Sequence, residues 1–124
     1  MEAFEMITIP AREEKPRKIG LTTLLDRGLG YHAASDLVEQ AADYIDLIKL
    51  GWGIARLIPQ ETLKKKIALY RDYQIMVSNG GTILELAYQH GKVKEFFASR
   101  YARPAISSKI PTASFFFSSN LLAR

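Results

Sequence analysis

The sequence predicts an α/β fold built on a parallel sheet, and three observations lead to that prediction. Three mostly apolar segments of strand-like length begin near residues 17, 44 and 74. Amphipathic segments with a helical repeat lie between and after them. The spacing of about 30 residues matches successive βαβ units. Because strands of this kind are buried on both faces, helices should cover the sheet and the crossovers should be right-handed.

The first strand and the first helix follow from residue type and periodicity. Residues 17–25, "RKIGLTTLL", are mostly apolar and include β-branched residues, as strands do. Over residues 33–42 the apolar positions then have the spacing of a helix that covers a surface: Ala34, Leu37, Val38, Ala41 and Ala42. A second strand is predicted at residues 44–50, "YIDLIKL".

A second helix is predicted to open with Pro59, because proline suits the first helical turn. Its buried face is formed by three residues: Leu63, Ile67 and Tyr70. The lysines at 64–66 are interpreted as its solvated side rather than as a basic patch. The third strand follows at residues 74–78, "QIMVS".

A short helix is predicted to start at Thr82 and to end at His90-Gly91, and another to cover residues 92–100. Thr82 and Glu85 have the spacing of a capping box, which explains both residues without a further role. Free N–H groups at such a start can also bind an anion. Three residues lie just before it: Asn79, Gly80 and Gly81.

Composition excludes several classes of protein. The 124 residues suffice for one domain, and the absence of cysteine excludes disulfides and thiolate metal sites. His32 and His90 lack zinc-type spacing. The N-terminus carries acidic residues and no apolar run, which is unlike a signal peptide. The longest uncharged run, residues 110–123, is too short to span a membrane, so we expect a cytoplasmic protein.

The basic pI near 9.4 does not indicate a nucleic-acid partner. Residues 1–99 contain all 13 acidic residues and 13 of the 17 basic ones, so their net charge is zero. The net charge of +4 comes from four residues near the C-terminus: Arg100, Arg103, Lys109 and Arg124. A neutral body with a sparsely basic end lacks the clustered positive charge that nucleic acid requires.

Chemistry in parallel α/β sheets gathers where strands end and helices begin. Lys49 ends a strand face that is otherwise apolar, where its ammonium would bind an anionic ligand, form an ion pair or extend to solvent. Asp46 lies on the opposite face, against the helices, as a structural partner or a helix-contact residue. Gly51 and Gly53 allow a sharp turn, and Trp52 between them would line a pocket or plug the sheet.

Asp26 and Arg27 follow the first strand directly. The arginine fork suits phosphate, sulfonate or carboxylate, while the aspartate would hold Mg²⁺ or orient the arginine. Because aspartate and glycine are also common turn residues, a simple turn explains this segment equally well.

Three segments together resemble the phosphosulfolactate synthases: "KPRKIGLTTLLDRGLG", "DYIDLIKLGWG" and "NGGTILELAYQHGKVKEFF". The likeness covers roughly residues 15–98. It implies a (β/α)8 TIM-barrel enzyme, a carbon–sulfur lyase that adds sulfite to phosphoenolpyruvate with Mg²⁺ as cofactor. The product, phosphosulfolactate, would serve the synthesis of coenzyme M or of other sulfonates.

The residues at the predicted sheet edge agree with such a reaction, and each has an expected role in it. Lys49 and Asp26 would be catalytic, and Glu85 would bind the metal. Substrate binding would involve seven residues: Arg27, Gly51, Trp52, Gly53, Gly80, Gly81 and Thr82. These groups suit small anionic substrates, because they are cationic, donate N–H groups or border the same predicted sheet edge.

The chain carries three of the eight βα units that a TIM barrel needs. We interpret residues 1–100 as a partial barrel domain and residues 101–124 as an atypical tail, disordered or read in a shifted frame. Such a chain is expected to be inactive or barely active. The alternative is a noncatalytic α/β fragment that binds a small anion or forms a homo-oligomer through its open sheet edges.

Overall fold

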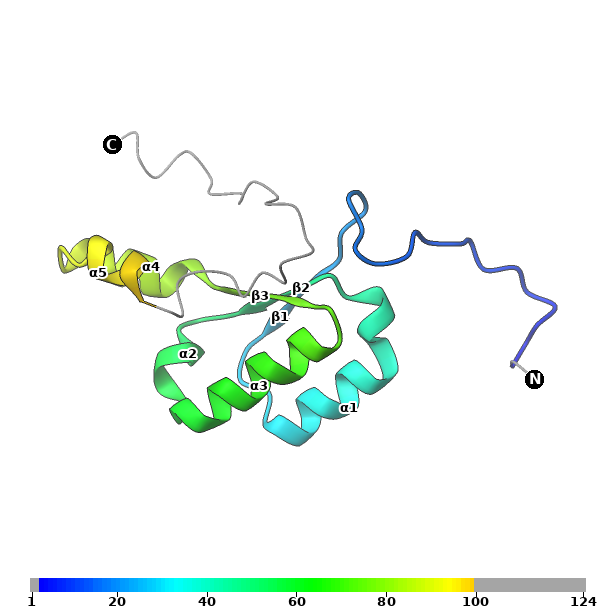
Figure 1. Cartoon of the computed structure of the whole chain (residues 1–124), viewed down its shortest axis with the longest axis horizontal. Helices are drawn as coiled ribbons and strands as arrows, with labels where there is room; N and C mark the ends of the chain where they lie inside the picture. The colour runs from blue at the N-terminus through cyan, green and yellow to red at the C-terminus, as the bar shows by residue number, and fades with distance from the viewer. Residues whose placement is uncertain (1–2, 100–124) are drawn as a thin grey trace.

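The computed structural model describes residues 3–99 and contains a three-stranded parallel sheet (Figure 1). Its strands are β1 (Thr23–Asp26), β2 (Leu47–Leu50) and β3 (Met76–Asn79), and they lie in the order β1-β2-β3. The predicted α/β class with a parallel sheet is therefore confirmed. What is observed is one open sheet, which is consistent with part of a barrel.

The three strands end level with one another. Leu25, Lys49 and Ser78 lie side by side across the sheet, and the next row contains Asp26, Leu50 and Asn79. Hydrogen bonds continue one residue beyond β2 and β3, from the Gly51 N–H to the Asp26 carbonyl and from the Gly80 N–H to the Leu50 carbonyl, both at 2.8 Å. The loops that follow the three strands therefore start at a common edge.

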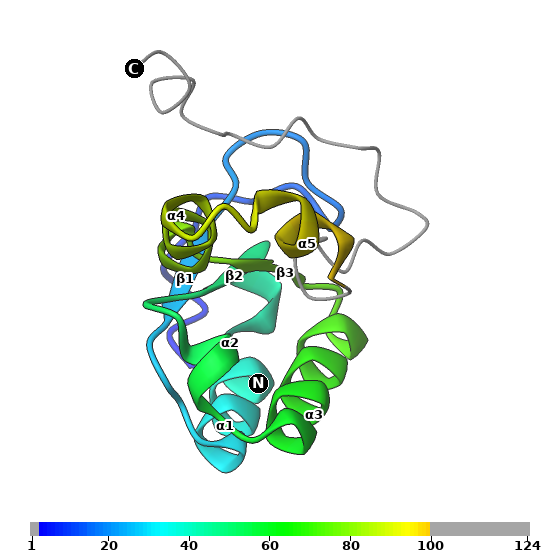
Figure 2. The same ribbon diagram turned by 90° about the vertical axis from the view of Figure 1, so that its left-hand side faces the viewer.

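Helices cover one face of the sheet. The face is packed by α1 (Tyr31–Ala41) and α3 (Gln60–Asp72), with the short α2 (Ile54–Leu57) at its side, as Figure 2 shows. A 3-10 turn, η1 (Ala42–Tyr44), follows α1. The apolar stripes of the helices meet the helix-facing strand residues in one core, whose completely buried members include Ala34, Val38, Ile48 and Tyr70.

The opposite face of the sheet carries the alternate residues of each strand. Leu25, Lys49 and Ser78 belong to it, and Leu25 remains 44% exposed. Helices α4 (Gly81–Gln89) and α5 (Val93–Ala98) lie beyond the carboxyl ends of the strands, pack on each other and bury no residue completely (Figure 1). In a closed barrel this open face would be the interior.

The amino edge of the sheet is closed by the segment before β1. The buried Asp46 carboxylate accepts hydrogen bonds from the Arg17 guanidinium and from the Thr22 N–H, each at 2.8 Å. This confirms Asp46 as a structural partner. It also explains why β1 begins at Thr23 and not at residue 17: residues before Thr23 turn to bind Asp46, and Gly20 has a φ of 62°.

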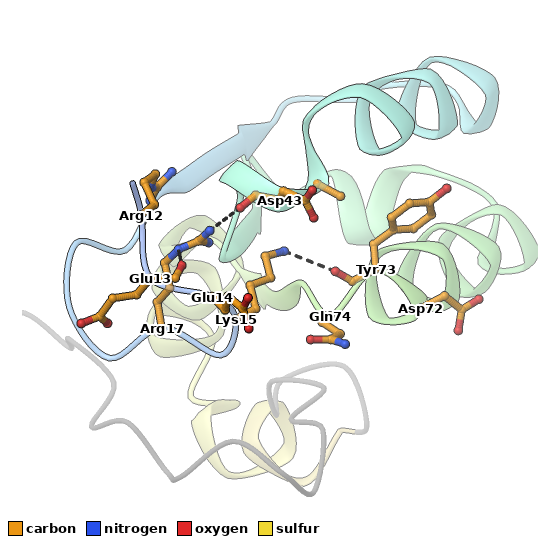
Figure 3. A pocket seen from close by; sticks show the side chains of 10 residues that line it. Arg12, Glu13, Glu14, Lys15, Arg17, Asp43, Asp72, Tyr73 and Gln74 are labelled. Atoms are coloured by element: carbon orange, nitrogen blue, oxygen red, sulfur yellow. Dashed lines mark hydrogen bonds between the residues drawn. The ribbon is translucent and has the colours of Figure 1, made fainter. Parts of the chain in front are cut away.

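A polar pocket of about 550 Å³ lies at the same amino edge (Figure 3). In it Lys15 donates a hydrogen bond to the Tyr73 carbonyl and Arg17 donates one to the Asp43 carbonyl. These two cations are therefore already hydrogen-bonded to backbone carbonyls of the protein. Burial lowers the pKa of Lys15. Since ligands of parallel α/β sheets bind at the carboxyl ends of the strands, the pocket is not the predicted site.

The sequence placed every described element except α2 and η1, whose lengths of 4 and 3 residues leave too little periodicity to detect. No helix among residues 3–99 is long and apolar enough to cross a membrane. The predicted tail, residues 101–124, lies outside the described residues.

Asp46→Ala should lower the free energy of unfolding by about 3–5 kcal/mol, because it leaves the buried Arg17 guanidinium without its carboxylate. The side chains of Arg17 and Asp46 are only 7% and 4% exposed, so the pair is largely shielded from solvent. Urea unfolding followed by circular dichroism measures the loss. Asp43→Ala is the matched control, since only the backbone carbonyl of the exposed Asp43 binds Arg17. Equal losses in both variants would contradict this account of the amino edge.

Candidate functional site

The level strand ends bring five predicted site residues to one edge of the sheet. We call this set the carboxyl rim: Arg27, Lys49, Trp52, Gly80 and Gly81. Arg27 follows β1, Lys49 is the penultimate residue of β2 with Trp52 in the next turn, and the two glycines follow β3. The pairing register, and not proximity in the sequence, places them together.

Lys49 projects from the open face and is exposed. A Cβ atom on Gly80 would lie 3.4 Å from the Lys49 Cε and 3.1 Å from the Leu50 carbonyl oxygen. The lack of a side chain at Gly80 thus leaves room for the lysine to extend along the ends of the strands. Within residues 3–99 the Lys49 ammonium forms no ion pair or hydrogen bond, so the described part of the chain offers this cation to a ligand.

Arg27 and Trp52 pair across the rim. The Arg27 guanidinium lies 5.2 Å from the centroid of the Trp52 ring, within cation–π distance. Trp52 is 65% exposed and therefore does not plug the sheet. Its φ of 51° lies in the left-handed region, which costs a non-glycine residue about 1–3 kcal/mol. The turn thus presents the ring outward at the rim despite backbone strain.

Gly51 and Gly53 are buried residues that shape this turn. A Cβ on Gly51 would lie 2.6 Å from the Leu25 Cδ1, and its N–H already donates to Asp26. Gly53 has a φ of 77°, and a Cβ there would lie 3.2 Å from the Ile83 Cδ1. The positive φ favours glycine at position 53, whereas the Leu25 and Ile83 methyl groups are ends of side chains that can move. Gly51 has no free N–H to offer a substrate.

Asp26 is not brought together with Lys49, although both were predicted to be catalytic. It points to the helix face and is completely buried. Burial alone would raise the pKa of its carboxyl. Hydrogen bonds from Lys66, from the Gly28 and Leu29 N–H groups and from Tyr70 oppose this effect and hold the pKa below its ordinary value. With all these donors bound, Asp26 is a structural anion beneath the rim.

The interpretation of the lysines at 64–66 as a solvated face is wrong for Lys66. Its side chain is completely buried, and its ammonium lies 2.6 Å from the Asp26 Oδ2. It also donates to the Leu29 carbonyl at 2.6 Å. The sequence held a signal for this, because Lys66 stands three residues after Leu63 and four before Tyr70, on the apolar stripe of α3.

The predicted capping box at the start of α4 is also wrong. The N-cap is Gly80, no side chain caps the helix, and Thr82 is an exposed residue inside the first turn. The first N–H groups of the helix, beginning with that of Gly81, have no acceptor within it. Glu85 is exposed, and its Oε1 would lie 3.4 Å from a Cβ on Gly81, so this carboxylate is near the rim.

The described residues do not by themselves make a magnesium site. Residues 3–99 contain no group of three histidine or acidic side chains that could hold a metal. Mg²⁺ is often bound by one or two carboxylates with water and substrate oxygens. Asp26 is saturated with donors, so only Glu85, of the two predicted carboxylates, is exposed near the rim.

Comparisons with known proteins match the sequence that contains this sheet. The sequence model of the (2R)-phospho-3-sulfolactate synthase family (ComA) matches residues 10–102, which include the sheet and its rim. This chain belongs to the phosphosulfolactate synthase family. The resemblance noted in the sequence is thereby confirmed.

Proteins named phosphosulfolactate synthase are similar over the same region. The one from Methanothermobacter thermautotrophicus is 44% identical over 97 residues, which is 78% of this chain and 37% of the relative. The one from Bacillus subtilis is 36% identical over 90 residues, 73% of this chain and 35% of the relative. This chain therefore spans just over a third of the length of the curated relatives that it matches.

Lys66→Met should lower the free energy of unfolding by about 3–5 kcal/mol, because it leaves the buried Asp26 carboxylate without its cation. The neighbouring Lys65 is exposed on the same helix, so Lys65→Met provides a matched control that should change stability by no more than about 0.5 kcal/mol. Denaturant unfolding of the two variants beside the wild type measures both effects. If both variants unfold like the wild type, Lys66 is solvated after all.

Proposed function

We propose that the carboxyl rim is the anion-binding part of a phosphosulfolactate synthase site, which takes phosphoenolpyruvate and sulfite. The proposal rests on one observation: Lys49, Arg27 and the start of α4 all lie at the same edge of the sheet. Membership of the family supports the same reaction class.

The chemistry of the proposed reaction requires positive charge at such an edge. The sulfur lone pair of sulfite would form a bond to the methylene carbon of phosphoenolpyruvate. The electrons of the carbon–carbon double bond would then move toward the carboxylate, and a proton would finally add to the adjoining carbon. Because negative charge increases on the carboxylate, fixed cations beside it stabilise the intermediate.

Individual roles follow from placement. Lys49 would hold the substrate carboxylate or phosphate as a compact point charge, and Arg27 would bind a second anionic group with its planar fork. Gly81 and Thr82 would offer N–H groups at the first turn of α4. Trp52 would border the site, while Gly51, Gly53 and Gly80 would keep backbone and side chains out of it. Glu85 would be a ligand of Mg²⁺, which would stabilise negative charge on the substrate.

A second candidate function is favoured by the exposed sheet. Within residues 3–99, β1 and β3 are edge strands, and Leu25 on the open face is 44% exposed. A noncatalytic piece of this kind would bind a small anion or associate with further copies. Mass from size-exclusion chromatography with light scattering separates a monomer from such an assembly.

Sulfite-dependent consumption of phosphoenolpyruvate by the purified chain tests the reaction. We expect binding of phosphoenolpyruvate with slow or undetectable turnover, because the chain covers only 37% of its Methanothermobacter relative. That full-length relative, assayed in parallel, is the positive control. Turnover by the chain at the rate of the relative would contradict the expected impairment. No detectable binding of phosphoenolpyruvate would contradict the proposed site.

Lys49→Ala and Arg27→Ala should each weaken phosphoenolpyruvate binding about ten-fold or more, because a hydrogen bond to a charged group is worth roughly 1.5–3 kcal/mol. Isothermal titration calorimetry at constant ionic strength measures the affinity. Lys65→Ala removes an equal charge from the exposed side of α3 and controls for net charge. An effect of Lys65→Ala as large as that of Lys49→Ala would show that binding depends on net charge and not on the rim.

A further inference from the structure

The loop between β1 and α1, residues 27–30, forms hydrogen bonds with two buried side chains, Asp26 and Lys66. The Asp26 Oδ1 accepts hydrogen bonds from the N–H groups of Gly28 and Leu29, each at 2.9 Å. The Lys66 ammonium donates to the Leu29 carbonyl at 2.6 Å. Gly28 has a φ of 121°, so the backbone here takes a conformation that favours glycine. The loop path is thus fixed by three hydrogen bonds to buried groups.

Those buried groups form one network that joins α3 to the end of β1. Lys66 lies 2.6 Å and the Tyr70 hydroxyl 2.8 Å from the same oxygen, the Asp26 Oδ2. All three side chains are completely buried. Within residues 3–99 no buried side-chain polar atom lacks a hydrogen-bond partner, so this network is complete.

Stability alone gives little reason for such a network. A buried ion pair often contributes no more than apolar residues of the same volume, although the loss of one partner is costly. What it supplies here is a single geometry, since every donor and acceptor of the network has a specific partner. Burial, together with the nearby Asp26 carboxylate, raises the pKa of Tyr70, so its hydroxyl remains a donor throughout the ordinary pH range.

Arg27 is the residue that this loop presents at the rim. It is exposed, and its guanidinium lies over Trp52. We propose that Lys66 and Tyr70, through Asp26, are positioning residues that hold the 27–30 loop so that Arg27 stays over Trp52 and ready to receive an anion. The anion-binding part of this inference depends on the proposed function, whereas the placement of Arg27 does not.

The chain contains a single tryptophan, which reports the position of Arg27 without any ligand. Iodide is an anion, so a guanidinium beside Trp52 should make iodide a better quencher of its fluorescence relative to neutral acrylamide. Arg27→Ala should lower this iodide preference, and the Lys49 ammonium at the same rim accounts for any preference that remains. The charge-neutral double variant Asp26→Leu/Lys66→Met removes the three ties to the loop and should lose the preference to the same extent. Adding Arg27→Ala to that double variant should cause no further loss.

Two further variants keep the result interpretable. Tyr70→Phe removes one hydrogen bond without changing charge, and it replaces the double variant should that protein fail to fold by circular dichroism. A partial loss of iodide preference is expected for it. Lys65→Met, which changes an exposed lysine of the same helix, should retain the wild-type preference. Full wild-type preference in a folded Asp26→Leu/Lys66→Met or Tyr70→Phe protein would overturn the proposal.

Phosphoenolpyruvate titrations separate this inference from the proposed function. One outcome is that the network variants lose the iodide preference while the wild type does not bind phosphoenolpyruvate. That outcome would refute the proposed function and would still support the positioning role. Equal affinity for phosphoenolpyruvate in the wild type and in the network variants would refute the positioning role for substrate binding. Weaker binding in the network variants, matched to their loss of iodide preference, would support both.

Discussion

The parallel register of the three strands is the constraint on which the rest of the structure depends. It places Lys49 between Leu25 and Ser78, and it lets the Gly51 and Gly80 N–H groups bond to the ends of the neighbouring strands. A shift of one residue in β2 would move Lys49 into the helix-facing core and Leu50 onto the open face. The rim, the core and the separation of the two edges all follow from this alignment.

Alternation along these strands also separates two kinds of charge. Asp26 faces the helices, where an isolated carboxylate would be strongly destabilising, and so it is surrounded by Lys66, Tyr70 and two backbone N–H groups. Lys49 faces the open side and has no partner within residues 3–99. Strand β1 thus ends in the Asp26 carboxylate, whose charge is neutralised within the core. Strand β2 ends with the Lys49 ammonium, which can bind an anionic ligand on the open side of the sheet.

The order of strands and helices could be predicted from the sequence because both periodicities are strong, in the stripe of Ala34 and Val38 and in the apolar run through Ile48. The meeting of Arg27, Lys49 and Gly81 could be predicted because parallel strands share a carboxyl edge. The partners of individual side chains are harder to predict from the sequence. The amphipathic pattern favours a solvated side for the lysines at 64–66 as a group, and the pairing of Lys66 with Asp26 joins residues 40 positions apart. The cap at Gly80 could not be read from residue type, since Thr82 and Glu85 have the spacing of a capping box without making it.

The central claim is that the level carboxyl ends of three parallel strands form one anion-binding rim. Chemical-shift mapping by NMR with phosphoenolpyruvate tests it most directly, because each backbone amide reports its own position. The account predicts that the largest shifts occur at the Gly81 and Thr82 amides, at the Trp52 indole and at the Arg27 side chain. Shifts confined to the amino-edge pocket, at Arg17 and Tyr73, would contradict it.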